Sequence, residues 1–352
     1  MRASLLYSFL FIFLLVDCTS ESLDVLDPTQ GQGQGTPVQF YYTIEDREDS
    51  TVTRAVNESN RLADGSKIGI WALWWKQKNE ATGDYIYINN PGTAWDNVNI
   101  RNGFKNACYV AKTESTVNGN TTTYQYLFKP EEGTEVGTIP DLGGLRVFAY
   151  YPYQTDLYNN YISPNMPKIN VKAESSYLST HDAREIEDYL YTGPIEATDE
   201  NSSINLTFRH AMAQIQVYVR TTNANWQNAL VAPRINKLTL TTTYQIGKME
   251  LETGNFIPSL SDFSSQKYDL SHTIGRNYGT SPMATFLVFP EATTEKDQTT
   301  VLSLDANISA AIASGTYAEG KDNSLFFMTA DNTITISKGK ITKVYITINK
   351  IN

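Results

Sequence analysis

The feature that most constrains the fold is a strict alternation of apolar and polar residues in short segments. Within residues 38–45 every second side chain is apolar, which places these side chains on one face of an extended chain. They are Val38, Phe40, Tyr42 and Ile44. Residues 340–350 repeat the pattern near the end of the sequence, with Val344, Ile346 and Ile348 on one face. A period of two is typical of a half-buried strand, so both segments are predicted strands.

Further strands are predicted throughout the chain, separated by turns rich in Asn, Gly and Pro. Residues 67–75 are apolar on both faces, which predicts a central strand. The other predicted strands are 85–88, 124–128, 145–151, 206–210, 213–219, 235–240, 247–251, 284–289, 300–304, 325–328 and 333–337. The apolar phase shifts near Ala211 and Met212, which indicates a bulge or break there.

Helical periodicity is almost absent, although residues 182–191 are expected to hold a short helix or a polar crossing. Strands at this spacing predict an all-β protein built from two β-sandwich domains. We place these domains at residues 38–194 and 195–352.

The N-terminal region has the pattern of an export signal. An apolar run at residues 5–16 is too short to span a bilayer and fits a signal-peptide core, so residues 1–17 form the predicted signal peptide. The run ends in Leu-Val-Asp followed by Cys18, which looks like a lipobox whose thiol carries a lipid anchor. The alternative is an ordinary signal peptide with an incidental cysteine. Residues 18–37 are polar and contain alternating Gly and Gln, which predicts a flexible tether.

The net charge limits the classes of partner that the protein can bind, and the cysteine content limits the ways in which its fold can be stabilised. The formal net charge of -10 argues against nucleic acid or an anionic membrane surface as a partner, because both require clustered Lys and Arg. Apart from Cys18, Cys108 is the only cysteine. Without an internal disulfide, stability must come from the hydrophobic cores.

Residues that could carry chemistry do not form a recognisable catalytic or metal-binding pattern. His181, His210 and His272 lack the spacing of a zinc site, and His210 is expected to bond to the backbone. Cys108 is expected to be a buried thiol. Acidic pairs such as Glu131 and Glu132 are too common to predict a glycosidase. We therefore predict no enzyme activity, no metal and no cofactor.

Tryptophans allow two interpretations. Exposed Trp side chains can stack on sugars, whereas buried ones fill cores and subunit interfaces. The residues concerned are Trp71, Trp74, Trp75 and Trp95. We expect packing, and glycan binding remains the alternative.

A set of motifs is distributed over nearly the whole chain. Its parts are Cys18, the step Thr53-Arg54-Ala55, residues 64–70, the aromatic segment 148–153, residues 188–191, residues 208–213, residues 286–290, and the last strand after Gly339-Lys340. Together, these motifs resemble the fimbrillin family of type V pilus subunits, the Mfa-like and FimA-like group.

This resemblance implies transthyretin-like sandwiches, outer-membrane lipoprotein export and assembly with other pilus subunits into a surface fimbrium. In such subunits a protease cuts after an Arg, and the cut removes an N-terminal strand whose slot a neighbour's strand then fills. Arg54 best matches the cut site, with Arg47 as the alternative. A cell-surface lipoprotein that binds a glycan or host ligand without polymerising is the alternative function.

An exposed slot of this kind would present unpaired backbone groups beside an apolar trench, which an alternating strand can fill. We therefore expect residues 38–44 to be the placeholder strand. The C-terminal strand containing Val344, Ile346 and Ile348 is the expected donor, unless it is simply the last strand of its own sheet.

Overall fold

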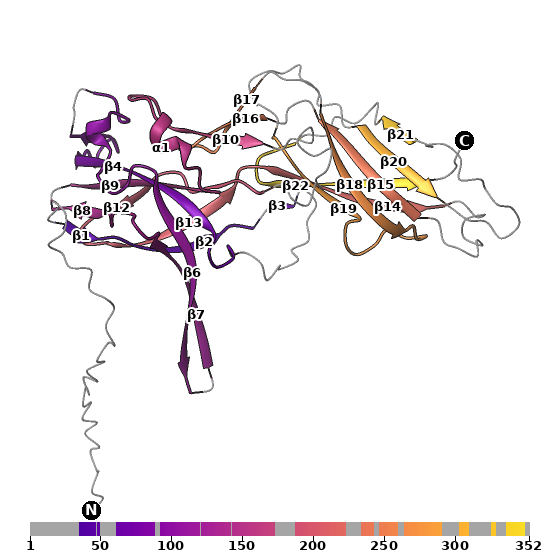
Figure 1. Cartoon of the computed structure of the whole chain (residues 1–352), viewed down its shortest axis with the longest axis horizontal. Helices are drawn as coiled ribbons and strands as arrows, with labels where there is room; N and C mark the ends of the chain where they lie inside the picture. The colour runs from indigo at the N-terminus through magenta and orange to yellow at the C-terminus, as the bar shows by residue number, and fades with distance from the viewer. Residues whose placement is uncertain are drawn as a thin grey trace, which may run out of the picture. The chain divides into compact units, whose positions relative to one another are not determined.

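The alternating segments form strands in the computed structural model of the chain (Figure 1). The structure describes residues 35–46, 48–49, 61–88, 92–119, 121–141, 143–172, 187–222, 234–242, 246–259, 264–290, 303–309, 325–328 and 336–348. In these ranges the only helical elements are α1 (Asp156–Asn160) and the 3-10 turn Asn97–Asn99. The protein is therefore all-β, as predicted.

The largest sheet has nine strands, and part of it closes on itself. Its strands, in spatial order, are β12 (Ile195–Ala197), β9 (Gly144–Tyr151), β11 (Leu190–Tyr191), β13 (Ser203–His210), β2 (Gln39–Ile44), β7 (Thr121–Pro130), β6 (Ala107–Asn118), β4 (Lys67–Lys78) and β5 (Tyr85–Tyr87). An additional pairing of β9 with β4 joins the two ends of the series from β9 to β4. Seven strands thus form a closed circuit, with β5 and β12 attached outside it.

The remaining strands form four smaller sheets. They are β1 (Gly35–Pro37) with β8 (Thr138–Pro140); β10 (Lys168–Lys172), β16 (Ile246–Glu250) and β17 (Phe256–Pro258); β19 (Ala284–Val288), β14 (Ala213–Thr221), β22 (Lys340–Ile348) and β3 (Glu48–Asp49); and β18 (Ser264–Thr273), β15 (Arg234–Thr242), β20 (Ser303–Ser309) and β21 (Leu325–Met328).

The central strand β4 is buried on both faces, as its sequence predicted. On one face Ile68 and Ile70 belong to a core that includes residues of β2, β6, β7, β9 and β13. On the other face Trp71 and Leu73 pack with residues of α1, β10 and β16. A side chain at Gly69 would place its Cβ 2.1 Å from the ring of Tyr150, so this position in β4 requires glycine.

Several assignments made from the sequence differ from the structure. Residues 35–37, expected in the flexible tether, form β1, because their backbone pairs with β8. Residues 195–210, assigned to the second domain, belong to the nine-stranded sheet, so the chain changes sheets near the break at residues 211–212. Strand β6 was not predicted, because its outer half lacks a regular alternation of apolar and polar residues.

Of residues 182–191, where a short helix or a polar crossing was expected, the structure describes 187–191, and Leu190–Tyr191 there forms strand β11. Most of the predicted strand 333–337 lies outside the described residues. The division into two sandwich domains stays a prediction.

Burial of tyrosines predicts sensitivity to alkali. Burial raises the pKa of Tyr109, which is fully buried, to about 12, whereas an unfolded tyrosine ionises near 10. The folded state holds the Tyr109 proton more tightly than the unfolded state does. This contribution to the free energy of unfolding is fully present below pH ~10. It decreases by about 3 kcal/mol as pH rises toward ~12. We expect urea-unfolding free energies to fall steeply above pH ~10, and Tyr109→Phe to flatten that decline. An equally steep decline in Tyr109→Phe would contradict the assignment.

Candidate functional site: the slot of the N-terminal strand

The N-terminal strand β2 is inserted between two strands from distant parts of the chain. It runs parallel to β13, with Gln39 opposite Ser203 and Ile44 opposite Phe208. It runs antiparallel to β7 over a shorter length, with Phe40 opposite Phe128. Parallel neighbours cannot be joined by a tight turn, and β13 comes from a distant part of the chain. Strand β2 thus completes the closed circuit of the nine-stranded sheet.

The alternating face of β2 lies in the hydrophobic core. Val38, Phe40 and Tyr42 are buried and Ile44 is half-buried, which confirms the predicted alternation. The Phe40 ring lies edge-on to Tyr109, with centroids 5.3 Å apart, and Tyr42 stacks on Phe128 at 4.5 Å. Such pairs add to the stabilisation that comes from apolar burial alone.

Polar contacts also hold β2 in its slot. The Tyr42 hydroxyl donates to the Leu62 carbonyl oxygen at 3.2 Å, and burial raises the pKa of this hydroxyl. At the end of the strand, the backbone N–H of Glu45 donates to the Phe208 carbonyl oxygen at 2.8 Å. The slot therefore combines an apolar trench with backbone pairing on both sides.

The segments on either side of β2 are paired as well. Upstream, β1 lies against β8 so closely that a Cβ on Gly35 would meet the Ile139 carbonyl oxygen at 2.1 Å. Downstream, β3 runs parallel to β22, with Glu48 opposite Lys340. The N-terminal segment is therefore paired first with β8, then with strands of the nine-stranded sheet, and finally with β22.

The C-terminal strand β22 lies in a sheet of its own chain. It runs parallel to β14, with Ile341 opposite Gln214 and the backbone of Ile348 opposite Thr221. Ile346 is buried and Val344 is half-buried, while the side chain of Ile348 lies outside the described part of the structure. Strands β2 and β22 thus occupy similar places, each parallel to one of two strands that follow each other in the chain, β13 and β14.

A polar cleft of about 250 Å³ lies where β2 ends and β22 begins. Its lining residues are Glu45, Asp46, Tyr191, Arg209, His210, Lys338, Gly339 and Lys340. Arg209 Nε and Glu45 Oε1 form an ion pair at 3.3 Å, and His210 Nδ1 lies 2.5 Å from Asp188 Oδ2. The expected backbone partner of His210 is thus replaced by a carboxylate. The cleft contains charges of both signs, and within it Lys338 Nζ lies 5.0 Å from the centroid of the Tyr191 ring.

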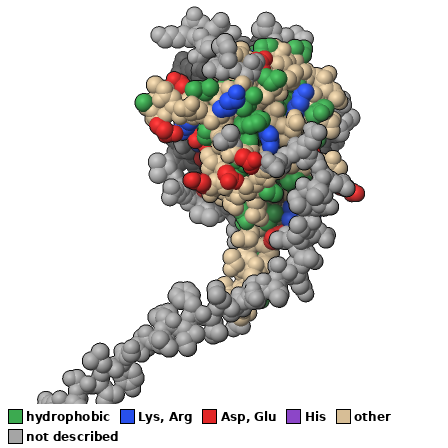
Figure 2. All heavy atoms as spheres, turned by 90° about the vertical axis from the view of Figure 1, so that its left-hand side faces the viewer, with side chains coloured by type: hydrophobic (Ala, Val, Ile, Leu, Met, Phe, Trp, Pro, Cys, Tyr) green, Lys and Arg blue, Asp and Glu red, His purple; other side chains and the backbone are tan. Residues whose placement is uncertain are grey.

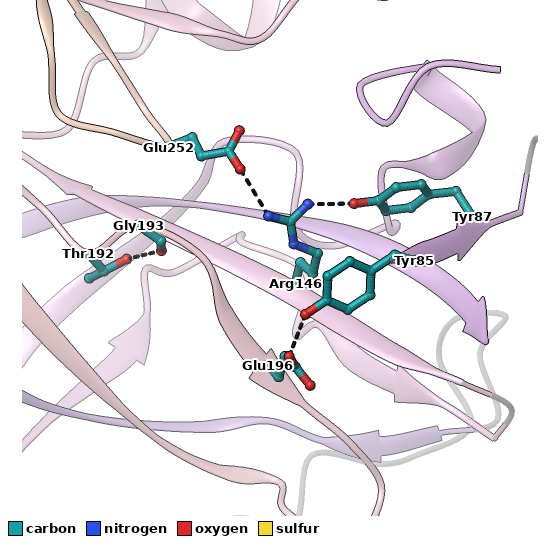
Figure 3. A network of polar contacts seen from close by, with 7 residues as sticks. All are labelled: Tyr85, Tyr87, Arg146, Thr192, Gly193, Glu196 and Glu252. Carbon is teal, nitrogen blue, oxygen red and sulfur yellow. Dashed lines mark hydrogen bonds and ion pairs between the residues drawn. The ribbon is translucent and has the colours of Figure 1, made fainter. Parts of the chain in front are cut away.

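A network around Arg146, which the sequence analysis missed, joins four parts of the chain (Figure 3). Arg146 on β9 donates to the Tyr87 hydroxyl at 2.6 Å and to Glu252 Oε1 at 2.9 Å, while Tyr85 donates to Glu196. Burial by itself lowers the pKa of Arg146, but the bonds to Tyr87 and Glu252 outweigh burial and raise it above its usual value. The partners of Arg146 lie on distant segments of the chain, so the residues next to it in the sequence gave no indication of this network. The network positions β5 and β12 on β9.

Tryptophans expected to pack do so. Trp71, Trp75 and Trp95 are buried, and the half-buried Trp74 has the Arg101 guanidinium 5.0 Å from its ring centroid. The three buried rings are covered by protein, so they do not form an open stacking surface for sugars. The interpretation as core packing is confirmed for the three buried residues.

The remaining candidate residues give no catalytic arrangement in the described ranges. Cys108 is buried, and burial raises its pKa to about 12, so the thiol stays protonated at neutral pH. Among the described residues, no group of three or more His, Cys, Asp or Glu side chains could hold a metal ion. Cys18, Arg47 and Arg54 lie outside the described residues.

The described surface carries charges of both signs. On the face shown in Figure 2, Lys and Arg side chains do not merge into one basic area, and Asp and Glu side chains are present beside them. No helix in the described ranges is both long and apolar enough to cross a bilayer.

Solved structures of other proteins can be superposed on this chain to different degrees. The chain superposes on a proposed cell adhesion protein of Bacteroides ovatus with a TM-score of 0.53 and 17% identity, covering 89% of this chain and 92% of that one. A proposed cell adhesion protein of Bacteroides uniformis gives a TM-score of 0.48 and 17% identity, covering 89% and 94%. A fimbrial protein of Bacteroides ovatus gives a TM-score of 0.37 and 12% identity, and the superposition covers 90% of this chain and 51% of that one.

The first of these likenesses supports a shared fold. No curated protein sequence matches the chain. The model of one protein family, described as fimbrillin-like, matches residues 53–352, which is most of the chain. The protein therefore belongs to the fimbrillin-like family.

Proposed function

We propose that this protein is a structural or adhesive subunit of a bacterial surface pilus, assembled by donor-strand exchange. Membership of the fimbrillin-like family supports a pilus or adhesion role at the cell surface, and it favours a structural protein over an enzyme. The observation that carries the finer proposal is the seating of β2. An N-terminal strand whose apolar face lies in the core occupies a slot that another strand of the same pattern could fill.

Proteolysis would convert this strand into a replaceable element. Both candidate cut sites, Arg47 and Arg54, follow β2 in the chain, so cleavage at either one separates β2 covalently from the body. The two sites differ in their effect on β3, since only a cut after Arg54 also releases Glu48–Asp49 from the body. After a cut at Arg54, departure of the fragment would therefore free the edge of β22 at Lys340 and Ile341 in addition to the slot of β2.

Cleavage alone does not empty the slot. The backbone pairing and the buried faces of Phe40 and Tyr42 remain after the peptide bond is cut. An incoming strand must therefore displace β2 and reproduce its alternation. The exposed edge of β13 and the apolar trench supply the driving force for this replacement.

In this proposal the C-terminal strand of a neighbouring subunit is the donor, using Val344, Ile346 and Ile348. Its parallel pairing with β14 matches the parallel pairing of β2 with β13, so the strand already has the required backbone geometry. It would leave its own sheet to enter the neighbour. Repetition of this heterologous contact produces an open filament of pilus subunits.

Before assembly, the subunit is proposed to be an outer-membrane lipoprotein anchored through Cys18. The apolar leader and the lipobox-like sequence before this cysteine support the proposal. Lipidation would hold the N-terminal segment at the membrane, and cleavage after an Arg downstream would release the body for assembly into the fimbrium.

Treatment with an Arg-specific protease tests the proposal. We expect the purified protein to lose its N-terminal segment and to form a ladder of oligomers that resist SDS, because each inserted strand is held by a full backbone ladder. Arg54→Ala should abolish the ladder if that site is used, whereas Arg47→Ala should leave it intact. Mass spectrometry of the released fragment identifies the cut.

The control is the untreated protein, which should stay monomeric in SDS because β2 fills its own slot. Complete removal of the segment with no oligomers at any protein concentration would contradict strand exchange. That outcome would favour a cell-surface binding protein that does not polymerise.

A further inference from the structure

The hairpin formed by β6 and β7 extends beyond the strands that flank it (Figure 1). Strand β4 pairs with β6 only at Ala107–Val110, and β2 pairs with β7 only at Leu127 and Phe128. The outer half of the hairpin, which we define as residues 113–118 and 121–126, is therefore a two-stranded ribbon in the described structure. A ribbon of two strands is marginally stable in water, and a third strand or a packing surface stabilises it.

One face of the outer half continues the buried face of the sheet. Phe128 and Ala111 are buried opposite each other, and the same face then carries Tyr126, Tyr124 and Val117 toward the tip. Tyr124 is 56% exposed and Val117 is 69% exposed. The other face carries the ion pair of Lys129 Nζ with Glu114 Oε1 at 2.6 Å. The outer half thus presents an apolar stripe without a covering layer in the described residues.

The two edges of the outer half differ in how well they are protected. Soluble proteins protect exposed edge strands with charges, proline or bulges. Along β7, residues 121–126 read Thr-Thr-Thr-Tyr-Gln-Tyr and contain neither charge nor proline, and the register against β6 shows no bulge. The edge of β6 carries Glu114, a charge that disfavours pairing with another strand. The edge of β7 is therefore the one suited to adding a strand.

We propose that the outer half of β7 pairs edge to edge, in the antiparallel sense, with the same segment of a second copy of this chain. The segment is complementary to itself when the pairing is centred on Thr123. Thr122 then lies opposite Tyr124 of the second copy, Thr121 lies opposite Gln125, and no like charges meet. Cross-strand pairs of an aromatic residue with Thr are favourable. Because the same segment is used by both copies, the contact has two-fold symmetry and forms a closed dimer.

This pairing extends two ribbons into one four-stranded sheet, which places Val117 and Tyr124 of both copies on a common face. The contact uses the uncleaved subunit, and it does not depend on strand exchange. Failure of either proposal therefore leaves the other intact.

Sedimentation equilibrium of the uncleaved protein tests the proposal with a matched pair of variants. Thr123 and Thr116 are exposed cross-strand partners at the same height of the hairpin, but only Thr123 lies on the β7 edge. Thr123→Lys should weaken dimerisation roughly tenfold or more, because it places like charges directly opposite each other. Thr116→Lys adds the same charge on the other strand and should leave dimerisation unchanged.

A cross-linking measurement confirms the register. In a Cys18→Ser background, Thr123→Cys should form a disulfide-linked dimer under mild oxidation, and Thr116→Cys should not. Cys108 is buried and does not interfere. A wild-type protein that stays monomeric at every concentration would overturn the proposal, as would an equal loss of dimer in both lysine variants.

Discussion

Replacing Phe40 with alanine is expected to lower the free energy of unfolding by about 3–5 kcal/mol. The Phe40 side chain is fully buried and contacts the rings of Phe104 and Tyr109. Truncation removes these contacts and leaves a cavity that the closed circuit of strands cannot easily collapse. Urea denaturation of the uncleaved protein, followed by tryptophan fluorescence, measures the change.

Gln39→Ala is the matched control, because Gln39 is the neighbouring residue of β2 and is exposed. It should change the free energy of unfolding by no more than about 0.5 kcal/mol. A Phe40→Ala effect as small as that of Gln39→Ala would show that β2 is not seated in the core, and the proposed placeholder role would fail with it.

Replacing Ile346 with aspartate is expected to destabilise the uncleaved monomer by about 3–5 kcal/mol. The side chain is buried on the inner face of β22, in a strand paired with β14 of the same chain. A carboxylate there would lack the water that solvates it, and the apolar contacts of isoleucine would be lost. Thermal unfolding followed by circular dichroism measures the loss.

Tyr345→Ser is the control on the adjacent residue of the same strand. Tyr345 is 52% exposed and stacks on Tyr218 with centroids 5.0 Å apart, so its loss should cost only about 0.5–1.5 kcal/mol. An Ile346→Asp protein as stable as the wild type would indicate that β22 detaches readily from its own sheet. If Ile346→Asp loses much of its stability, part of the protein will be unfolded. A failure of this variant to polymerise must then be judged against the fraction that is folded.

Pairing of β22 within its own chain affects how a donor role could work. The structure pairs β22 with β14 over eight residue positions. A donor role therefore requires the strand to exchange one sheet for another.

Local sequence predicted most strands, since a period of two requires only neighbouring residues. The pattern at residues 38–44 predicted which side chains of β2 are buried, and the apolar phase shift predicted the break between β13 and β14. It missed all of β6, whose exposed outer half lacks a regular alternation, and it also missed β10 and β18. It also missed β1, whose pairing with β8 is not visible in either segment alone.

The sequence by itself determined that the chain is all-β, which faces of its strands are apolar, and that an alternating strand precedes Arg47 and Arg54. Only the tertiary structure decided which strands are neighbours: β2 between β13 and β7, β22 beside β14, and Arg146 between Tyr87 and Glu252. The physical reason is that alternation depends on side chains a few residues apart. Strand pairing and buried polar networks depend instead on which distant segments bury their apolar faces together.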